Sequence, residues 1–343
     1  MNSSVCFDDV LLVPQFSDII SRKEIDLISC LDNRSRFRLP VISSPMDTVT
    51  GHKMARAMSD LGGLGIIHRY NTIADQVAMV KRALKSEYPE GNEVVGVAVG
   101  VSGDYLKRAS LAAKAGAKVI CVDIAHGHHT LMRHALKTLR NTLGNSVHIM
   151  AGNVATLEAF NDLSDWGADS IRVGIGGGSI CSTRIQTGHG MPTLQSVIDC
   201  ARSDRDAALI ADGGIRTSGD IVKALAAGAD FVMLGSLLAG TEESPGDTIF
   251  DKGSQRKVYR GMASKDAQLD WRGHAASEEG VSSTVPCKGD VKDVLAALEK
   301  GVRSGLSYTG AHNLVELRAK AKFVKQSSAG QRESFTHIML QDV

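Results

Sequence analysis

The stretch ALIADGGIRTSGDIVKALAAGADFVMLGS, residues 208–236, contains one complete strand–helix–strand unit. Short apolar runs at 208–214 and 230–236 lie on either side of a helical pattern at 218–229. A helix between two such runs is typical of parallel strands joined by a crossover. The stretch therefore predicts part of a parallel α/β sheet.

The same unit recurs along the rest of the chain. Further strand-like runs alternate with helical patterns, and they lie at 39–46, 63–68, 93–101, 117–125, 147–153 and 169–176. Eight such runs predict an α/β fold, a single (β/α)8 or TIM barrel, with an open doubly wound sheet as the alternative. The barrel is favoured because glycine-rich or polar tips follow all eight runs, at the end where a barrel keeps its active site.

Composition narrows the function classes. The chain has 343 residues, with 39 Lys and Arg against 38 Asp and Glu, so no basic excess indicates nucleic-acid binding. No leader pattern and no apolar run of membrane-spanning length occurs, and the six cysteines form no C-x-x-C pair. We expect a cytoplasmic protein with reduced thiols and no membrane partner.

No composition shift marks a second domain, so residues 1–343 are predicted to form one barrel domain. The long polar stretch at about 250–290 is predicted to be a mobile active-site flap after the eighth strand. Residues from about 322 to 343 are predicted to be a mobile C-terminal tail.

Glycines at the ends of the last two strands predict a phosphate site. Gly213, Gly214, Gly235 and Ser236 offer backbone amides where barrels bind phosphate, and Asp212 could accept a hydrogen bond from a ribose hydroxyl. The alternative is that these glycines only form tight turns.

The segment VGIGGGSICSTR, residues 173–184, places Cys181 in a glycine-rich loop past the sixth strand. A lone cysteine is more often a small buried hydrophobe, as Cys121 and Cys200 are expected to be. Loop amides and a nearby cation would raise the thiolate fraction, so Cys181 is a candidate nucleophile.

Several long motifs resemble the IMP dehydrogenase / GMP reductase family, and they occur in the family's order. They are SSPMDTVTGHKMARAM (43–58), GGLGIIHR (62–69), DIAHGHH (123–129), MAGNVAT (150–156), VGIGGGSICSTR (173–184), the 211–246 segment, YRGMAS (259–264) and EEGVSSTVPCKG (278–289). The resemblance spans about residues 7–310. It implies a (β/α)8 barrel, a purine nucleotide substrate (GMP or IMP), a nicotinamide cofactor and a homotetramer.

The resemblance also implies roles for individual residues. It identifies Cys181 as the nucleophile toward purine C2, Thr183 as its partner and Glu279 as a contact of the purine edge. Implied substrate-binding residues are Ser44, Met46, Ser179, Asp212, Gly214, Gly235, Ser236, Tyr259, Gly261 and Met262. Implied cofactor-binding residues are Asp123, Ala125, Gly127, Gly174 and Gly176. Carbonyls of Gly176, Gly178 and Cys181 would hold a monovalent cation such as K+, although Gly177 replaces the family's usual proline and should loosen this loop.

Two reactions share this machinery in the family. A reductase converts GMP to IMP and ammonia with NADPH, whereas a dehydrogenase oxidises IMP to XMP with NAD. Residues 80–100 run straight into the third strand without the regulatory CBS modules usual in dehydrogenases, and the flap lacks their Arg-Tyr pair because Gly273 follows Arg272. These features favour the reductase. A short dehydrogenase with Arg272 as the water-activating base is the alternative.

Two alternative functions outside this family remain possible interpretations of the sequence. The ADGGIR and DIVKALAAGAD segments also resemble the cofactor-phosphate site of flavin-dependent barrel oxidases, although those lack the cysteine loop. A nucleotide sensor without turnover is the other, against which Cys181, Thr183 and Glu279 argue.

Overall fold

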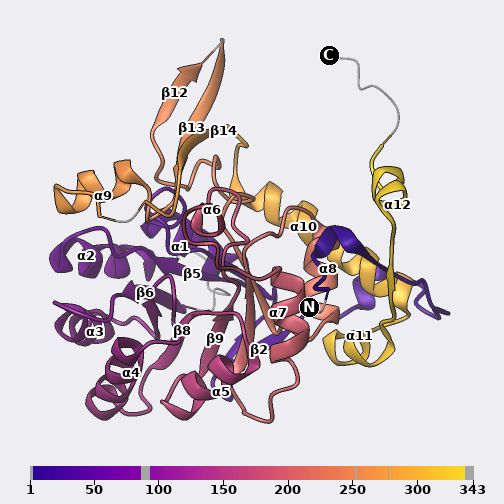
Figure 1. Cartoon of the computed structure of the whole chain (residues 1–343), viewed down its shortest axis with the longest axis horizontal. Coiled ribbons are helices and arrows are strands. Elements are labelled where there is room, and N and C mark those ends of the chain that lie inside the picture. The colour runs from indigo at the N-terminus through magenta and orange to yellow at the C-terminus, as the bar shows by residue number, and fades with distance from the viewer. Residues whose placement is uncertain (1–2, 86–92, 252, 277, 337–343) are drawn as a thin grey trace.

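Eight parallel strands close into a barrel in the computed structural model, which describes residues 3–85, 93–251, 253–276 and 278–336 (Figure 1). The strands are β4 (Val41–Ser43), β5 (Leu64–Ile67), β6 (Val95–Val99), β7 (Val119–Asp123), β8 (His148–Val154), β9 (Ser170–Val173), β10 (Ala208–Asp212) and β11 (Phe231–Leu234). They pair in chain order, and β11 pairs with β4. The predicted (β/α)8 barrel is confirmed, and the open sheet is excluded.

Helices surround the barrel as the periodicity predicts. They are α1 (His52–Asp60), α2 (Ile73–Ala83), α3 (Tyr105–Lys114), α4 (Thr130–Leu143), α5 (Leu157–Asp165), α7 (Thr193–Cys200), α8 (Ser218–Ala226) and α10 (Val291–Thr309). Side-chain caps set several of their starts. The hydroxyl of Thr72 accepts from the Asp75 amide, and Thr217 and Asp220 form a reciprocal capping box. Such caps satisfy the first amides of each helix and fix where the loop above the strand ends.

The amino-terminal end of the barrel is closed by a hairpin of β2 (Ser29–Asp32) and β3 (Ser35–Phe37). Its Leu31 and Phe37 belong to the apolar cluster inside the barrel, and the ring of Phe37 meets that of Phe231 edge-on at 5.6 Å. The hairpin plugs this end with packed side chains, so the opposite end is left for a ligand.

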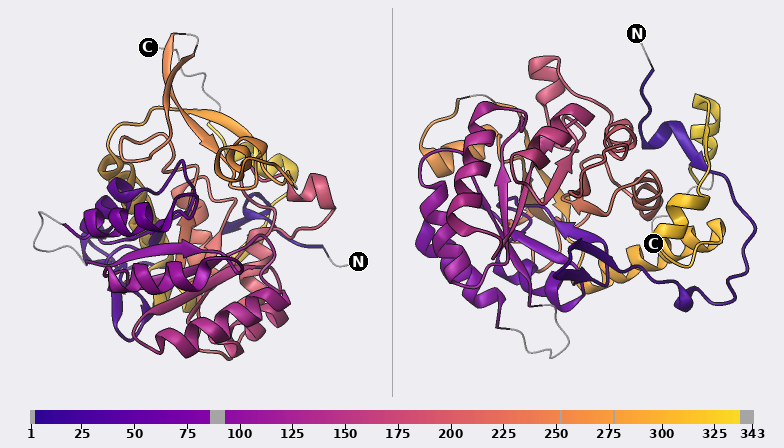
Figure 2. Two further views of the ribbon diagram at one scale, coloured as in Figure 1. Left: turned by 90° about the vertical axis from the view of Figure 1, so that its left-hand side faces the viewer. Right: turned by 90° about the horizontal axis from the view of Figure 1, so that it is seen from below.

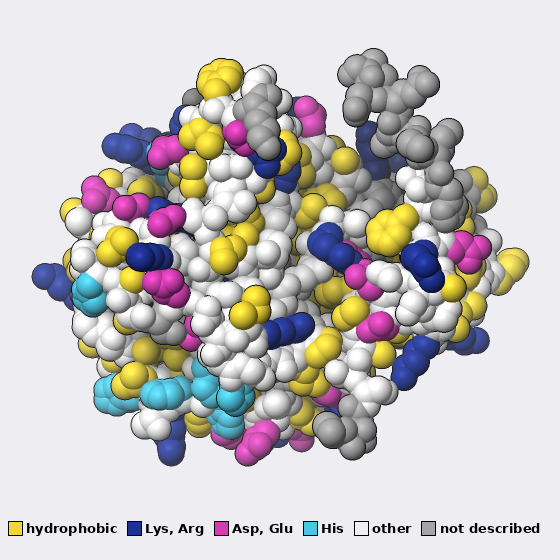
Figure 3. Space-filling model, turned by 45° about the horizontal axis from the view of Figure 1, so that its top comes forward, with side chains coloured by type: hydrophobic (Ala, Val, Ile, Leu, Met, Phe, Trp, Pro, Cys, Tyr) yellow, Lys and Arg dark blue, Asp and Glu magenta, His cyan; other side chains and the backbone are white. Residues whose placement is uncertain are grey.

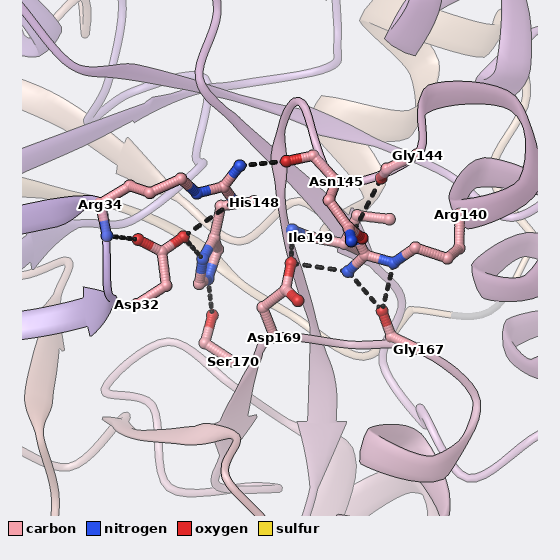
Figure 4. Close-up of polar contacts among 10 residues, drawn as sticks. All are labelled: Asp32, Arg34, Arg140, Gly144, Asn145, His148, Ile149, Gly167, Asp169 and Ser170. Atoms are coloured by element: carbon pink, nitrogen blue, oxygen red, sulfur yellow. Dashed lines mark hydrogen bonds and ion pairs between the residues drawn. The ribbon is translucent and has the colours of Figure 1, made fainter.

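A polar network surrounds this plug (Figure 4). The ring of His148, only 1% exposed, bonds to Asp32 at 3.0 Å and to Ser170 at 2.8 Å. Beside it, Arg140 pairs with Asp169 at 2.6 Å. The hydrogen bond from His148 holds the pKa of Asp32 well below its ordinary value. These contacts tie the hairpin to the starts of β8 and β9.

The segment predicted as a flap is folded where the structure describes it. It consists of β12 (Thr248–Asp251), β13 (Ser254–Arg260), helix α9 (Lys265–Arg272) and β14 (Ser282–Pro286), and its hairpin projects above the barrel in Figure 1. Lys257 anchors it by donating to the carbonyls of Thr241 and Ser244 at 2.8 and 2.6 Å. Lys288 donates to the Ser236 carbonyl at 2.6 Å. The flap is thus fixed at its base to the loop that follows β11.

Part of the segment predicted to be a mobile tail from residue 322 has regular secondary structure. Strand β15 (Phe323–Lys325) pairs antiparallel with β1 (Val10–Leu12), and helix α12 (Ser328–Glu333) follows it. Helix α11 (Leu314–Lys320) and the short 3-10 turns Phe7–Asp9 and Arg22–Glu24 complete this side, where the two ends of the chain run together (Figure 2). The partner strand lies more than 300 residues away in the sequence, so local patterning could not reveal the pairing. Residues 337–343 lie outside the described part.

We predict that Asp32→Asn destabilises the fold by about 1.5–3 kcal/mol at pH 7, since it removes a charged partner of buried His148. The pKa of Asp32 is lowered by folding, so its contribution is complete above the unfolded carboxyl value of about 4 and is lost as pH falls through the folded one. Urea unfolding of both proteins between pH 7 and pH 3 measures this. The gap should narrow in acid, and an equal change in exposed Asp206→Asn would contradict the assignment.

Candidate active site

A cavity of about 480 Å³ opens between the carboxyl ends of the barrel strands and the flap, a volume suited to small ligands. It gathers predicted residues from five strand ends and from the flap. Those lining it are Ser44, Met46, Asp123, Ala125, Gly174, Gly176, Gly178, Ser179, Cys181, Thr183, Asp212, Gly213, Gly214, Gly235, Ser236, Tyr259, Gly261, Met262 and Glu279. Of the predicted site residues, Gly127 is not among them.

Three of the lining side chains form a hydrogen-bonded chain. The Cys181 thiol donates to the Thr183 hydroxyl across 3.2 Å, and this hydroxyl donates to a carboxylate oxygen of Glu279 across 2.9 Å. A nucleophile, a hydroxyl and a carboxylate in this order can carry a proton away from sulfur or back toward a bound ligand.

Backbone pairing brings this chain together. Cys181 and Gly280 form an antiparallel bridge, the Ser182 amide donates to the Glu279 carbonyl at 3.0 Å, and the Val281 amide donates to the Ile180 carbonyl at 3.0 Å. The cysteine loop, which leads into the short helix α6 (Thr183–Thr187), is therefore held against the flap. Thr183 and Glu279 are neighbours because of this pairing, although 96 positions separate them.

A buried arginine connects the predicted substrate and cofactor sides. Arg172, 6% exposed, donates to Asp123 at 2.6 Å and to Asp212 at 2.9 and 3.1 Å. Burial alone would raise the pKa of Asp123, but the charges of Arg172 and then Arg69 outweigh it and lower the pKa. Burial would also lower the pKa of Arg172, and the two carboxylates raise it instead. Arg172 and Asp123 are therefore held in their charged forms, and the hydrogen bonds from Arg172 fix both aspartates as acceptors.

The hydrogen bonds to Asp212 define which oxygen faces a ligand. Its Oδ2 receives Arg172 and also the side-chain amide of Asn153 at 2.9 Å. No contact to its Oδ1 occurs within the described residues, and this oxygen is not one of the buried unpartnered atoms. Asp212 therefore offers one oxygen to a hydroxyl group such as that of a ribose.

The glycines predicted to bind phosphate surround one region of the cavity. Gly213 and Gly214 have φ of +94° and +78°, which favours glycine and turns their amides in a way side-chain-bearing residues rarely allow. A Cβ on Gly235 would lie 3.0 Å from the Tyr259 hydroxyl, which is 3.5 Å from the Ser179 hydroxyl. Amides and hydroxyls without acidic groups between them suit a phosphate.

The sequence and the fold both match proteins of known family. The model of the IMP dehydrogenase / GMP reductase domain matches residues 4–337. The chain belongs to the IMP dehydrogenase / GMP reductase family. Its members are oxidoreductases that act on purine nucleotides and use a nicotinamide dinucleotide.

Relatives with both activities are similar to this chain. It is 35% identical to the inosine-5'-monophosphate dehydrogenase of Nitrosopumilus maritimus (strain SCM1), over 97% of the chain and 98% of that protein. It is 34% identical to the GMP reductase of Leishmania major, over 96% of each. A crystal structure of a cysteine-to-alanine variant of Trypanosoma brucei GMP reductase in complex with guanosine 5'-monophosphate has a TM-score of 0.93 and 31% identity, over 99% of both chains. Identity therefore does not separate the two reactions.

These relatives contain residues that the chain lacks. The dehydrogenase alignment extends over 469 positions, more than the 343 residues present here. Helix α2 ends at Ala83 and β6 begins at Val95, where the sequence predicts no inserted CBS region, and residues 86–92 of this connection lie outside the described part. Among described residues, no helix combines the length and apolar character needed to cross a membrane.

Gly127, predicted to bind the cofactor, lies next to the cavity but does not line it. The amide of Gly127 donates to the Asn153 carbonyl at 2.7 Å, so Gly127 supports the cavity wall from behind.

Several histidine side chains, cyan in Figure 3, lie close together along the lower left edge of the molecule in that view. Burial, followed by the neighbouring His128, His129 and His189, lowers the pKa of His126. The lowered pKa favours the neutral His126 ring at pH 7, so this ring contributes little positive charge toward an anionic ligand.

The loop predicted to hold K+ is closely packed. The Gly178 carbonyl accepts from the Cys181 amide at 3.1 Å, and the Arg184 side chain lies against Gly176. A Cβ on Gly177 would lie 2.5 Å from the Thr193 hydroxyl, so glycine in place of proline accommodates this threonine. These contacts do not single out a cation site, and the cation stays a prediction.

Sequence reasoning missed several lining residues. They are Pro45, Arg69, Tyr70, Ile124, Asn153, Arg172, Ile175, Gly177, Ile180, Ile215, Met233, Ala263, Gln268, Ala276 and Gly280. Arg172 had a detectable signal, because an arginine inside an apolar barrel strand must find a partner. The two cysteines expected to be inert are buried, and burial raises the pKa of Cys121 and Cys200 to about 12 each.

We predict that Arg172→Met destabilises the protein by about 1.5–3 kcal/mol, because it leaves the half-buried Asp212 carboxylate without a cation and Asp123 with Arg69 alone. Urea unfolding at pH 7 measures the loss. Asp212→Asn added to Arg172→Met should recover part of it, since Asp212 is the carboxylate left without a cation. No recovery in the double variant would mean that packing, and not charge, dominates.

Proposed function

We propose that the protein is a GMP reductase, which converts GMP to IMP and ammonia with NADPH. The proposal rests on the hydrogen-bonded chain from Cys181 through Thr183 to Glu279, at 3.2 and 2.9 Å, taken together with the flap around Arg272. A deaminating enzyme must protonate a poor leaving group, and a carboxyl group linked to the nucleophile can supply that proton. The missing Arg-Tyr pair in the flap supports the same assignment.

Binding of GMP would use the groups described above. Its phosphate would lie among the amides of Gly214 and Gly235 and the hydroxyls of Ser179 and Tyr259, and its ribose would donate to Asp212. The GMP complex of the similar trypanosomal enzyme supports a purine nucleotide as the substrate. Asp123, whose two oxygens each accept from one arginine, has lone pairs left for hydroxyls of a dinucleotide, so these residues fit the cofactor.

The reaction would begin at the cysteine. The sulfur of Cys181 attacks C2 of the purine, and its proton passes through Thr183 to Glu279. Glu279 then protonates the 2-amino group, which leaves as ammonia, and a thioimidate remains on the sulfur. The nicotinamide cofactor supplies a hydride to C2 when bound. Collapse of the tetrahedral adduct releases IMP and returns the cysteine.

A short IMP dehydrogenase is the second candidate, and one observation favours it. Arg272 lines the same cavity as Cys181, where a water-activating group of a dehydrogenase would be needed. The thioimidate on Cys181 would then be attacked by water to give XMP, with NAD as the hydride acceptor.

Absorbance at 340 nm in two mixtures tests the proposal. We expect it to fall with GMP and NADPH, with one ammonia formed per NADPH consumed, and to stay constant with IMP and NAD. Cys181→Ala should abolish turnover while GMP binding stays within about tenfold, a change of roughly 1.4 kcal/mol. Reduction of NAD by IMP would instead identify a dehydrogenase, and GMP binding without either reaction would identify a sensor.

Replacing Glu279 with Gln should slow ammonia release by about a hundredfold or more, the usual size of general acid catalysis. Single-turnover release of ammonia measures that step, and the kinetic isotope effect with deuterated NADPH measures hydride transfer. The isotope effect should decrease, because deamination becomes limiting. Glu278→Gln is the matched control, since Glu278 does not line the cavity. An unchanged isotope effect with slower turnover would assign Glu279 to purine positioning only.

A further inference from the structure

Two arginines flank one aromatic ring at the wall of the active-site cavity. The guanidinium carbons of Arg69 and Arg272 lie 5.5 and 5.9 Å from the centre of the Tyr70 ring. Arg69 and Tyr70 follow β5 on the barrel, whereas Arg272 is the last residue of α9 in the flap. All three line the cavity, so barrel and flap together place two positive charges there.

The position of Arg272 is fixed by stacking. The ring of Trp271 stacks on Tyr70 at 5.9 Å with 17° between the planes, and the Tyr70 hydroxyl donates to the Met262 carbonyl at 2.7 Å. Helix α9 is thereby docked on the barrel rim. A guanidinium on an aromatic face keeps its charge and its N–H donors for a further partner.

No carboxylate among the described residues forms an ion pair with Arg272. Its flap neighbour Arg260 pairs with Asp47 at 2.7 Å and with Asp270 at 2.5 Å. For Arg272, the Tyr70 ring is the one guanidinium contact found among the residues that the structure describes. Arg69 shares its charge with Asp123 at 3.3 Å. This wall of the cavity therefore has an excess of positive charge and suits an anionic group.

The anion differs from the phosphate of the purine nucleotide. That phosphate has its own site among Gly214, Gly235 and Tyr259, whereas Arg69 is bonded to Asp123 on the other side of Arg172. The second ligand of the proposed reaction is a dinucleotide, which carries phosphates of its own.

We propose that Arg272, together with Arg69, binds a phosphate group of the dinucleotide cofactor, which makes Arg272 a binding residue and not a water-activating base. The inference rests on the proposed function. The pyrophosphate is common to NADPH and NADH, whereas the 2'-phosphate occurs only in NADPH. Either could occupy the site, and binding measurements separate them.

Calorimetric titration of the protein with NADP+ and with NAD+, neither of which reacts with GMP, tests the site without turnover. Arg272→Gln should weaken NADP+ binding about tenfold or more, the scale of one lost charge-assisted contact. Arg272→Lys should retain part of the affinity and of its salt dependence. Lys265→Gln is the matched control, because it removes one charge from the other end of α9 and leaves the cavity unchanged.

The affinities of Arg272→Gln for the two dinucleotides distinguish the possible results. Weakening of both dinucleotides supports the site and assigns the pyrophosphate, and weakening of NADP+ alone supports it and assigns the 2'-phosphate. Unchanged affinity for both in Arg272→Gln overturns the proposal, as does loss of IMP oxidation with unchanged dinucleotide affinity. The proposed function has its own test in the unmodified protein. Absence of GMP reduction there, with weakened binding in Arg272→Gln, would refute the reductase and retain the anion site.

Discussion

The backbone pairing between the cysteine loop and the flap is the contact on which the whole site depends. Ile180 and Ser182 exchange hydrogen bonds with Val281 and Glu279, and this pairing closes one wall of the cavity. Without this pairing, the Glu279 carboxylate would not be held next to the Thr183 hydroxyl. Cys181 and Glu279, the proposed nucleophile and its proposed proton acceptor, are therefore linked through Thr183 only when the flap is folded on the barrel. Both segments line the cavity, so a ligand bound there would contact both.

The two ends of the barrel use buried charge differently. At the closed end, Asp32 and His148 tie a hairpin to strand starts, and every ring nitrogen of this histidine has a partner. At the open end, Arg172 is shared by two aspartates that keep lone pairs for ligands. The first arrangement contributes to stability alone. The second fixes two acceptors at a set separation, which would orient the two ribose groups of the proposed ligands relative to each other.

Much of the fold was predictable because each element carries its own signal. The barrel strands are short apolar runs, and their helices have caps such as Thr72 that sequence alone reveals. Strand ends meet at one edge of a barrel, so Asp123, Cys181 and Asp212 could be placed together in advance. Contacts made by pairing of distant segments were not predictable. The β1–β15 pair, the folded flap and the stacking of Trp271 on Tyr70 depend on tertiary placement.

The choice between reductase and dehydrogenase depends on how one arginine is used. A carboxylate relay can run in either direction, giving a proton to an amine or taking one from water, so Thr183 and Glu279 alone do not decide. An arginine acting as a base must first lose a proton that it holds very tightly in water. An adjacent phosphate stabilises the charged guanidinium and makes that loss harder still. Phosphate binding and water activation by Arg272 therefore exclude each other, and the stacked position on Tyr70 beside Arg69 favours the phosphate.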